Sequence, residues 1–269
     1  MERFLYRLSK SRYADNFVLK GALMLTVWEA PLTRPTMDID LLGRIENSIE
    51  TTTTVTREIC QQEVEPDGIL FDVSNMDAKR IAEDADYEGI RIRFRGTLDT
   101  ARFIIQLDIG FGDIVIPSPE PTNYPTLLDL PAPQLRVYSR ESTVAEKFEA
   151  MAKLGILNSR MKDFFDLWLM SRHFGFDGLT LSAAIMKTFS TRGTNIQAEP
   201  IALTNTFAED TAKAAQWRGF IRRTRIKDAP QNLSDVVAGL AAFLTPIAEK
   251  LAAGHVFRAT WRAPGPWCE

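Results

Sequence analysis

Six prolines divide this chain into two parts with different residue patterns. They stand close together between residues 117 and 135, at Pro117, Pro119, Pro121, Pro125, Pro131 and Pro133. Proline lacks the backbone N–H donor and fixes one backbone dihedral, so this density forbids regular structure. We predict a connector at 117–135 between a domain of residues 1–116 and a domain of residues 136–269. The 269 residues suffice for two modest domains.

The first part has the pattern of an α/β domain. Residues 37–42, 68–73 and 89–96 predict strands, and the apolar run 101–109 predicts a central, buried strand. Helical patterns lie near residues 16–28, 48–64 and 76–84. In residues 89–96, Arg91, Arg93 and Arg95 alternate with apolar residues. These arginines form either the solvated face of an edge strand or a stripe that faces RNA.

The second part is helical. Apolar residues at three- and four-residue spacing predict helices at 142–154, 159–173, 180–189, 204–223 and 234–253. Ser142 is the expected N-cap of the first helix, and Val144, Phe148 and Met151 form its apolar face. The fold class is therefore α/β (α+β), with a mixed sheet and flanking helices followed by an α-helical domain.

Composition excludes several kinds of chemistry. With two cysteines and two histidines, the chain has neither a disulfide framework nor a thiolate zinc cluster, and little room for a histidine-based triad. A net charge of −3 argues against a wholly basic nucleic-acid binder. The chain contains no run of 18 apolar residues, and its first residues resemble no signal peptide, so we expect a cytoplasmic protein without membrane contact.

Asp38 and Asp40 are the strongest chemical feature. Side chains two apart in a strand leave the same face, so Ile39 enters the core while both carboxylates leave it. Two adjacent like charges are costly unless a cation lies between them. A solvated edge strand with two surface aspartates is the alternative interpretation.

A third carboxylate, Asp108, lies in the apolar run 101–109. A charge in such surroundings is expensive unless it is paired. If this strand lies beside the Asp38–Asp40 strand, three carboxylates converge, and oxygen donors of this kind suit Mg²⁺. The alternative is a structural aspartate that accepts hydrogen bonds from the N-terminus of a helix.

Four segments in this order resemble a known family. They are Phe17-Val-Leu-Lys-Gly-Ala, Arg34-Pro-Thr-Met-Asp-Ile-Asp-Leu-Leu, Val144-Ala-Glu-Lys-Phe-Glu-Ala and Arg160-Met-Lys-Asp-Phe-Phe-Asp-Leu. Together they resemble the AbiEii (MenT-like) toxin nucleotidyltransferases of the DNA polymerase beta-like superfamily. The resemblance runs from about residue 15 to residue 172.

The resemblance implies an enzyme that transfers a nucleotide from a nucleoside triphosphate to an acceptor, foremost the 3′ end of an RNA such as tRNA. It further implies that Asp38, Asp40 and Asp108 bind Mg²⁺ or Mn²⁺, and that a separately encoded antitoxin is the partner. Ala22 departs from the family pattern, which has glycine or serine there. Phosphate contacts are therefore expected from the backbone of Gly21 and Ala22, beside Lys20.

Four further residues are candidates for the nucleotide site. Lys147 either holds a triphosphate or is an ordinary solvated lysine. Lys162 is expected to contact phosphate, and Asp163 to orient it or the acceptor hydroxyl; an acidic first helical turn is the alternative. Arg34 either contacts the nucleotide or is a surface arginine of a loop. Arg160 is expected to pair with Glu146 or Asp163.

A basic segment, residues 217–227, is a candidate RNA contact. It carries five basic residues and no acid. Its arginines could neutralise a nucleic-acid backbone while Trp217 or Phe220 stacks on a base. An amphipathic helix end with buried aromatic residues is the alternative. Trp261 and Trp267 are expected to be packing anchors.

Three alternative functions remain open at this point. A non-catalytic nucleic-acid or partner-binding module on the same fold would not depend on metal. The same carboxylates and lysines could instead serve phosphoryl transfer, or nucleotidyl transfer to a small molecule.

Overall fold

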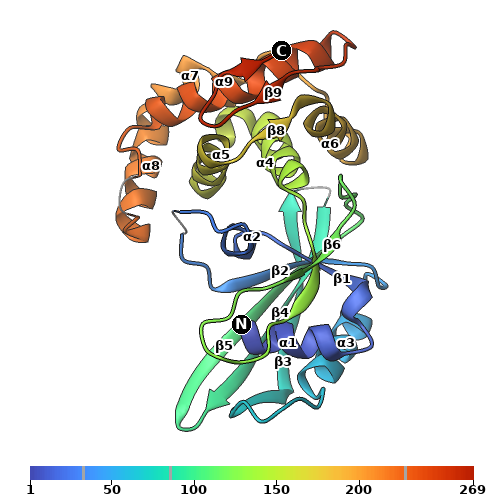
Figure 1. The fold of residues 1–269 in the computed structure, drawn as a ribbon. Coiled ribbons are helices and arrows are strands. Elements are labelled where there is room, and N and C mark those ends of the chain that lie inside the picture. Colours follow the sequence, from blue (N-terminus) through green and yellow to red (C-terminus); the bar gives the residue numbers. More distant parts are fainter. Residues whose placement is uncertain (32–33, 85–86, 227–228) are drawn as a thin grey trace. The chain divides into compact units, whose positions relative to one another are not determined.

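The computed structural model describes residues 1–31, 34–84, 87–226 and 229–269 (Figure 1). These residues form two interleaved units. The first unit consists of Met1–Glu29, Thr36–Asp113 and Ser118–Tyr138. The second unit consists of Ala30–Pro35, Ile114–Pro117 and Ser139–Glu269. Each unit therefore draws on segments that are separated in the sequence.

A mixed sheet organises the first unit. Within the described residues it has seven strands in the order β3-β4-β5-β2-β1-β7-β6. The β2–β5 and β1–β7 pairs are parallel, and the others are antiparallel. The strands are β1 (Phe17–Lys20), β2 (Asp38–Gly43), β3 (Ile69–Asp84), β4 (Tyr87–Leu98), β5 (Ala101–Phe111), β6 (Glu120–Asn123) and β7 (Gln134–Val137).

One face of this sheet is apolar and packs on helices. Ile39 of β2 and Leu107 of β5 are paired in register and are almost fully buried there. Phe4 of α1 (Glu2–Lys10) packs on Phe94 of β4 with ring centroids 5.8 Å apart. The helix α3 (Ile49–Cys60) also contacts β3, and Ser48 caps its start by accepting a hydrogen bond from Thr51. This burial leaves the opposite face for the polar side chains of the strands.

One predicted helix of the first unit is wrong, and another is shorter than predicted. Residues 76–84 belong to β3, because pairing along the whole of β4 overrides their local helical pattern. Residues 17–20 are strand β1, and the helix α2 begins only at Leu23 and ends at Val27. Since β3 covers β4, the strand that carries Arg91 is an inner strand and not an edge.

The proline-rich segment is also more regular than predicted. It contains β6, and β7 begins at its end, so the prediction of no regular structure at 117–135 is wrong. Pro121 is the proline inside a strand, and that strand, β6, is the last in the sheet order. An edge strand tolerates proline because one side of it makes no ladder hydrogen bonds. The parallel pairing of β7 with β1 extends the first unit to Tyr138.

Helices dominate the second unit, as predicted. They are α4 (Arg140–Leu154), α5 (Met161–His173), α6 (Gly178–Thr191), α7 (Asn205–Ala208), α8 (Thr211–Thr224) and α9 (Leu233–Ala252). A small sheet joins β8 (Phe176–Asp177), β9 (Thr260–Trp261) and β10 (Trp267–Cys268). Single 3-10 turns occupy Ala14–Asn16 in the first unit, and Gly155–Leu157 and Ile201–Leu203 in the second.

Local capping explains two differences from the predicted helices. Ser139, not Ser142, caps α4, since the Ser139 side chain accepts a hydrogen bond from the backbone N–H of Ser142. The predicted helix 204–223 is two helices, because Asp210 caps a new start at α8 by accepting from the backbone N–H of Lys213. Both caps satisfy N–H groups that a helix leaves without an internal partner.

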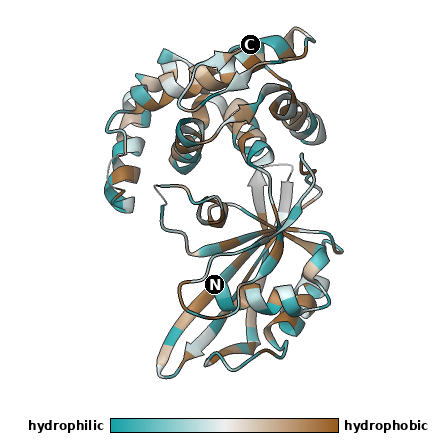
Figure 2. Cartoon of the chain, viewed as in Figure 1, coloured by the Kyte–Doolittle hydropathy of each residue, from teal (hydrophilic) through white to brown (hydrophobic). Residues whose placement is uncertain are grey.

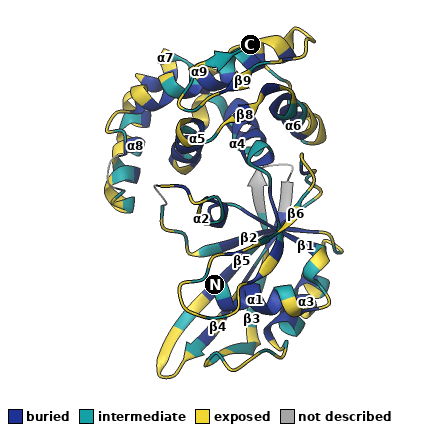
Figure 3. Ribbon diagram, viewed as in Figure 1, coloured by how far each residue is buried: buried dark blue, intermediate teal, exposed yellow. Residues whose placement is uncertain are grey.

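Aromatic side chains fill the core of the second unit. The helices α4 and α5 are mostly buried, while α8 carries many exposed residues (Figure 3). Apolar residues recur along these helices, as the colours of Figure 2 show. Trp261 is 2% exposed and Trp267 stacks on Phe243, which confirms both tryptophans as packing anchors. None of the described helices has the length and apolar character needed to cross a bilayer.

Candidate active site

The register of two strands brings the predicted carboxylates onto one face of the sheet. In the parallel β2–β5 pair, Asp40 lies opposite Asp108 and Asp38 lies opposite Gln106. Paired residues point to the same face, and so do residues two apart in a strand. All three carboxylates are partly exposed on this face, while Ile39 and Leu107 are buried on the other. We call Asp38, Asp40 and Asp108 the carboxylate face.

Arg91 of β4 binds the third of these carboxylates. It lies opposite Asp108 in the antiparallel β4–β5 register. Its Nε and Nη2 each donate to an oxygen of Asp108 at 2.7 Å. These hydrogen bonds raise the pKa of Arg91; partial burial opposes them, and the negative charges of Asp38 and Asp40 add to the rise. The positive charge of the Arg91 guanidinium is therefore stabilised by all three carboxylates.

Gly21 allows the carboxylate of Asp40 to approach the backbone. Its φ is +74°, a conformation that favours glycine. A Cβ at this position would lie 2.0 Å from Oδ2 of Asp40. Glycine is thus required here twice, for its backbone conformation and for the space that it leaves. Ala22, which follows it, is the N-cap residue of α2.

Lys20 has a buried partner. It lies opposite Asp40 in the β1–β2 register, and its Nζ donates to Oδ2 of Asp113 at 3.0 Å. The two side chains are 9% and 4% exposed. Asp113 follows β5, after Gly112 at a φ of +84°, and the sequence interpretation missed it. The Gly112-Asp113 turn was the one local signal that could have pointed to it.

The donor chemistry of the carboxylate face fits a divalent cation. Three carboxylates on one face are the hard oxygen ligands that Mg²⁺ prefers. Among the described residues, however, no three acidic, histidine or cysteine side chains are arranged to hold a metal ion. Both oxygens of Asp108 accept hydrogen bonds from Arg91, and Oδ2 accepts a further one from Gln106. A carboxylate oxygen has two lone pairs, so a cation could contact Oδ1 of Asp108 while Arg91 keeps its hydrogen bonds.

The second unit contains a buried cluster of opposite charges. Lys147 of α4 contacts two carboxylates of α5, with its Nζ 2.6 Å from Asp163 and 3.0 Å from Asp166. Arg34 donates to both oxygens of Asp166, at 2.9 and 3.0 Å. Arg160 donates to Asp163 at 2.6 Å. We call these five residues the charge cluster; it holds three cations and two anions.

The electrostatics keep this cluster ionised. Burial would raise the pKa of Asp163, but the charges of Lys147, Arg160 and Lys162 outweigh it and hold the pKa well below its usual range. Burial lowers the pKa of Lys147, yet Asp163 and Asp166 together leave it above its ordinary value. Lys147 is consequently a fixed cation and not a proton acceptor.

Several predicted roles change with these contacts. Arg34 is not a surface arginine, since its side chain is 11% exposed and pairs with Asp166. Arg160 pairs with Asp163, as one of the two predicted options stated, and Glu146 lies near Arg192 instead. Lys162 is exposed at the first turn of α5.

The aromatic residues of the basic segment do not face solvent. Trp217 is fully buried and its Nε1 donates to the backbone oxygen of Pro230. Phe220 is 6% exposed. The prediction that either ring stacks on a nucleic-acid base is therefore wrong, and both belong to the core. Lys227, at the end of the segment, lies outside the described residues.

Comparison with known protein families identifies the class of enzyme to which this chain belongs. The family model described as nucleotidyl transferase AbiEii toxin, type IV toxin–antitoxin system, matches residues 3–241. The chain therefore belongs to the AbiEii toxin family. An antitoxin is the partner that membership in such a system implies.

Two solved structures from Helicobacter pylori are similar to this chain. One is a candidate nucleotidyltransferase and the other is the protein JHP933. Each is 14% identical, has a TM-score of 0.47 and matches 94% of this chain, with 93% and 90% of its own chain covered respectively. No curated protein matches the chain significantly.

Proposed function

We propose that this protein transfers a nucleotide from a nucleoside triphosphate to the 3′ end of an RNA, with tRNA as the foremost acceptor. The observation that carries this proposal is the register of Asp40 with Asp108, with Asp38 two residues along the same face. Family membership supplies the reaction class. The carboxylate face supplies the acidic residues that such a reaction requires.

In the proposed reaction, the acceptor hydroxyl attacks the α-phosphorus of the triphosphate, and pyrophosphate leaves. Asp38, Asp40 and Asp108 would hold Mg²⁺ or Mn²⁺, which neutralises charge on the phosphates when it is bound. Arg91 positions Asp108 by its two hydrogen bonds and limits the negative charge of the face. Lys20 and Asp113 fix the end of β1, so that the Gly21 backbone stays close to Asp40.

We assign phosphate binding to backbone and cationic groups. The backbone N–H groups of Gly21 and Ala22 stand at the start of α2, where a helix offers donors to an anion. Lys147 and Arg34 are cations of the charge cluster, whose three positive charges exceed its two negative ones. Lys162 is exposed, so a phosphate can reach its amine. Asp163 positions Lys147 through their ion pair, and in this proposal it acts through that lysine.

The proposal is tested by radiolabel transfer. Purified protein, Mg²⁺ and total cellular RNA are incubated with each α-labelled nucleoside triphosphate in turn, and with a γ-labelled one. We expect one or more α-labels to enter RNA, and Asp40→Asn to reduce this transfer by at least 100-fold, because charge stabilisation of this kind contributes about that much. Asp129→Asn, an exposed aspartate in a loop of the same unit, is the matched control.

Other outcomes would contradict the proposal. Equal transfer by the wild type and by Asp40→Asn would remove the carboxylate face from the reaction. Label that enters only from the γ-position would indicate phosphoryl transfer. RNA binding that is unaffected by chelation, with no transfer from any triphosphate, would indicate a non-catalytic module.

A further inference from the structure

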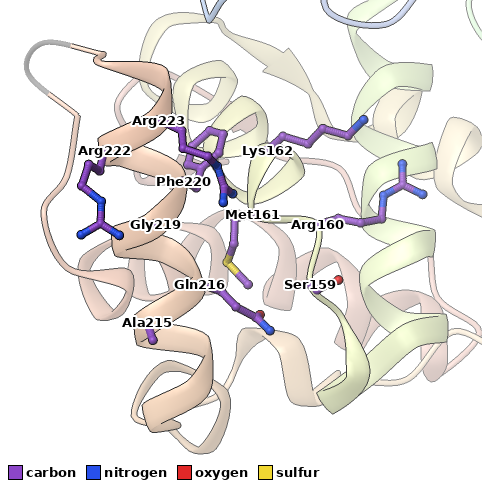
Figure 4. Close-up of a pocket in the computed structure, with 10 residues that line it drawn as sticks. All are labelled: Ser159, Arg160, Met161, Lys162, Ala215, Gln216, Gly219, Phe220, Arg222 and Arg223. Atoms are coloured by element: carbon purple, nitrogen blue, oxygen red, sulfur yellow. The ribbon is translucent and has the colours of Figure 1, made fainter.

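A pocket of about 650 Å³ lies in the second unit, between the start of α5 and the helix α8 (Figure 4). Arg160, Met161 and Lys162 line it from the α5 side. Gln216, Phe220 and Arg223 line it from α8. In Figure 4, Gln216 and Arg223 extend from α8 toward Met161, while Arg222 points away from α5. The pocket is not part of the proposed active site apart from Lys162 and Arg160.

The charged side chains that line this pocket are all positive. Arg222 and Arg223 are exposed and make no ion pair with another residue of the described part of the chain. No acid occurs between Thr211 and Thr224, so nothing on α8 offsets these cations. Arg218 and Arg222 are four residues apart on α8, and like charges at this spacing on a helix repel one another. An anionic ligand would remove this repulsion.

The helix dipole explains only part of the arrangement. Arg222 and Arg223 stand in the last turn of α8, where a cation is favourable without any ligand. Arg160 and Lys162 stand at the start of α5, where the dipole disfavours a cation. The hydrogen bond to Asp163 explains the position of Arg160. Lys162, in contrast, is exposed and makes no hydrogen bond to a described residue. The helix dipole therefore does not account for the basic residues on both sides of the pocket.

The lining also offers a place for an uncharged ring. Met161 and Phe220 are 3% and 6% exposed and form an apolar floor. The Oε1 atom of Gln216 is buried and has no hydrogen-bond partner. A Cβ at Gly219 would meet only the end of the Arg223 side chain, at 4.0 Å, so the surface of α8 is open there. An unsatisfied amide above an apolar floor suits the edge and face of a nucleobase.

The basic residues extend beyond the pocket. Arg218 and Arg222 are exposed four residues apart on one side of α8, and Arg225 is exposed at the C-cap that follows Thr224. The three guanidinium groups therefore extend over about two turns at the end of this helix. A single phosphate group cannot occupy that length. The stripe therefore favours a strand of linked phosphates over a free nucleotide.

We propose that this pocket and the adjoining outer surface of α8 bind single-stranded RNA, with one base over Met161 beside Gln216, one backbone phosphate on Arg223 at the pocket, and further phosphates on Arg218 and Arg222 along the helix. Within the proposed function, this strand is the acceptor. The binding itself does not require the transfer reaction, so the two proposals can be tested separately.

The experiment measures binding of the full chain to fluorescein-labelled oligouridylate and oligoadenylate by anisotropy, without triphosphate or metal, over a range of salt concentrations. The test variant is Arg222→Gln/Arg223→Gln. The control is Lys187→Gln/Lys250→Gln, which removes two exposed charges from α6 and α9 of the same unit. We expect the test variant to bind about tenfold more weakly or worse. Its salt slope should fall by about 1.4, because each lost phosphate contact in a single strand removes about 0.7.

Gln216→Leu tests the base contact. We expect it to change the ratio of the affinities for oligouridylate and oligoadenylate while it leaves the salt slope unchanged. An unchanged ratio would overturn the base contact. Circular dichroism confirms that each variant is folded.

Two results would overturn the strand proposal. One is equal binding by the test variant and the control. The other is a free triphosphate that competes with the oligonucleotide at equal affinity and loses its own binding in the test variant. If the wild type binds RNA through Arg222 and Arg223 but transfers no nucleotide, the proposed function fails and the pocket stands. If the wild type transfers a nucleotide while the test variant binds RNA normally, the proposal of RNA binding at the pocket is wrong and the proposed function is retained.

Discussion

Single side chains decide the geometry of the carboxylate face. Gly21 is the clearest case, since any side chain there would overlap the carboxylate of Asp40. A role of Gly21 in phosphate binding depends on a bound ligand. The steric requirement for glycine depends only on the position of Asp40 in the protein. Arg91 is a second case, because its two hydrogen bonds fix the orientation of Asp108.

The role of Gly21 gives a prediction about stability. Gly21→Ala forces a Cβ to within 2.0 Å of Asp40 and also places alanine at a φ of +74°. We expect the free energy of unfolding to fall by about 2–4 kcal/mol, from backbone strain and overpacking together. Urea denaturation measures this change.

Gly193→Ala separates the two causes. Gly193 has a φ of +64°, but a Cβ there meets nothing within 4 Å. Its loss of stability should be confined to backbone strain, about 1 kcal/mol. Equal losses in the two variants would show that the contact with Asp40 contributes nothing.

At the scale of elements, two helices of the second unit are joined by charge as well as by packing. Lys147 of α4 bridges Asp163 and Asp166 of α5. The aspartates are each 1% exposed, so their charges depend on these partners. Removing one partner of such a buried pair costs more than the pair itself contributes, because it leaves a charge without compensation.

Asp163 gives a prediction about pH. Its pKa is lowered in the folded state, so it stabilises the fold above the unfolded-state pKa of about 3.9, and this contribution is lost as the pH falls below that value. Asp163→Asn should lower the free energy of unfolding at pH 7 by about 3–5 kcal/mol. It should also flatten the decline of stability in acid. Urea denaturation across the acidic range measures both effects.

Asp235→Asn is the control for this prediction. Asp235 is an exposed aspartate in the first turn of α9, and its replacement should leave the acid decline unchanged. If Asp163→Asn and the wild type lose stability in parallel as the pH falls, Asp163 is not a source of the acid sensitivity.

At the scale of the whole molecule, the two units do not follow the proline-rich segment. The strand β7 pairs with β1, and β6 pairs with β7, so residues after Pro117 complete the sheet. The segments Ala30–Pro35 and Ile114–Pro117 belong to the second unit although they flank or interrupt the first. A division of the chain at residue 116 therefore leaves β1 as an edge.

This edge gives a prediction about fragments. A fragment of residues 1–116 lacks β6 and β7, and the exposed backbone groups of β1 should promote association through strand pairing. A fragment of residues 1–138 keeps the whole sheet. Size-exclusion chromatography should show the shorter fragment as oligomers and the longer one as a larger share of monomer. Identical monomeric profiles would contradict the importance of the β1–β7 pair.

The sequence alone determined the features that repeat with a short period. Alternation over two residues placed Asp38 and Asp40 on one face, and three- and four-residue spacing predicted the helices of the second unit. The four ordered segments were sufficient to indicate the family. Such patterns can be recognised in a sequence because each depends on residues that lie only a few positions apart in the chain.

Only the tertiary structure decided which charges meet. Arg34 and Asp166 form an ion pair although 132 residues separate them in the sequence. The residues around each of them do not indicate that the other is its partner. The same holds for β3, whose helix-like residues are strand because β4 lies beside them. Strand order, buried ion pairs and the basic pocket all arise from long-range packing, whose energies depend on burial and distance in the folded chain and leave no periodic trace in the sequence.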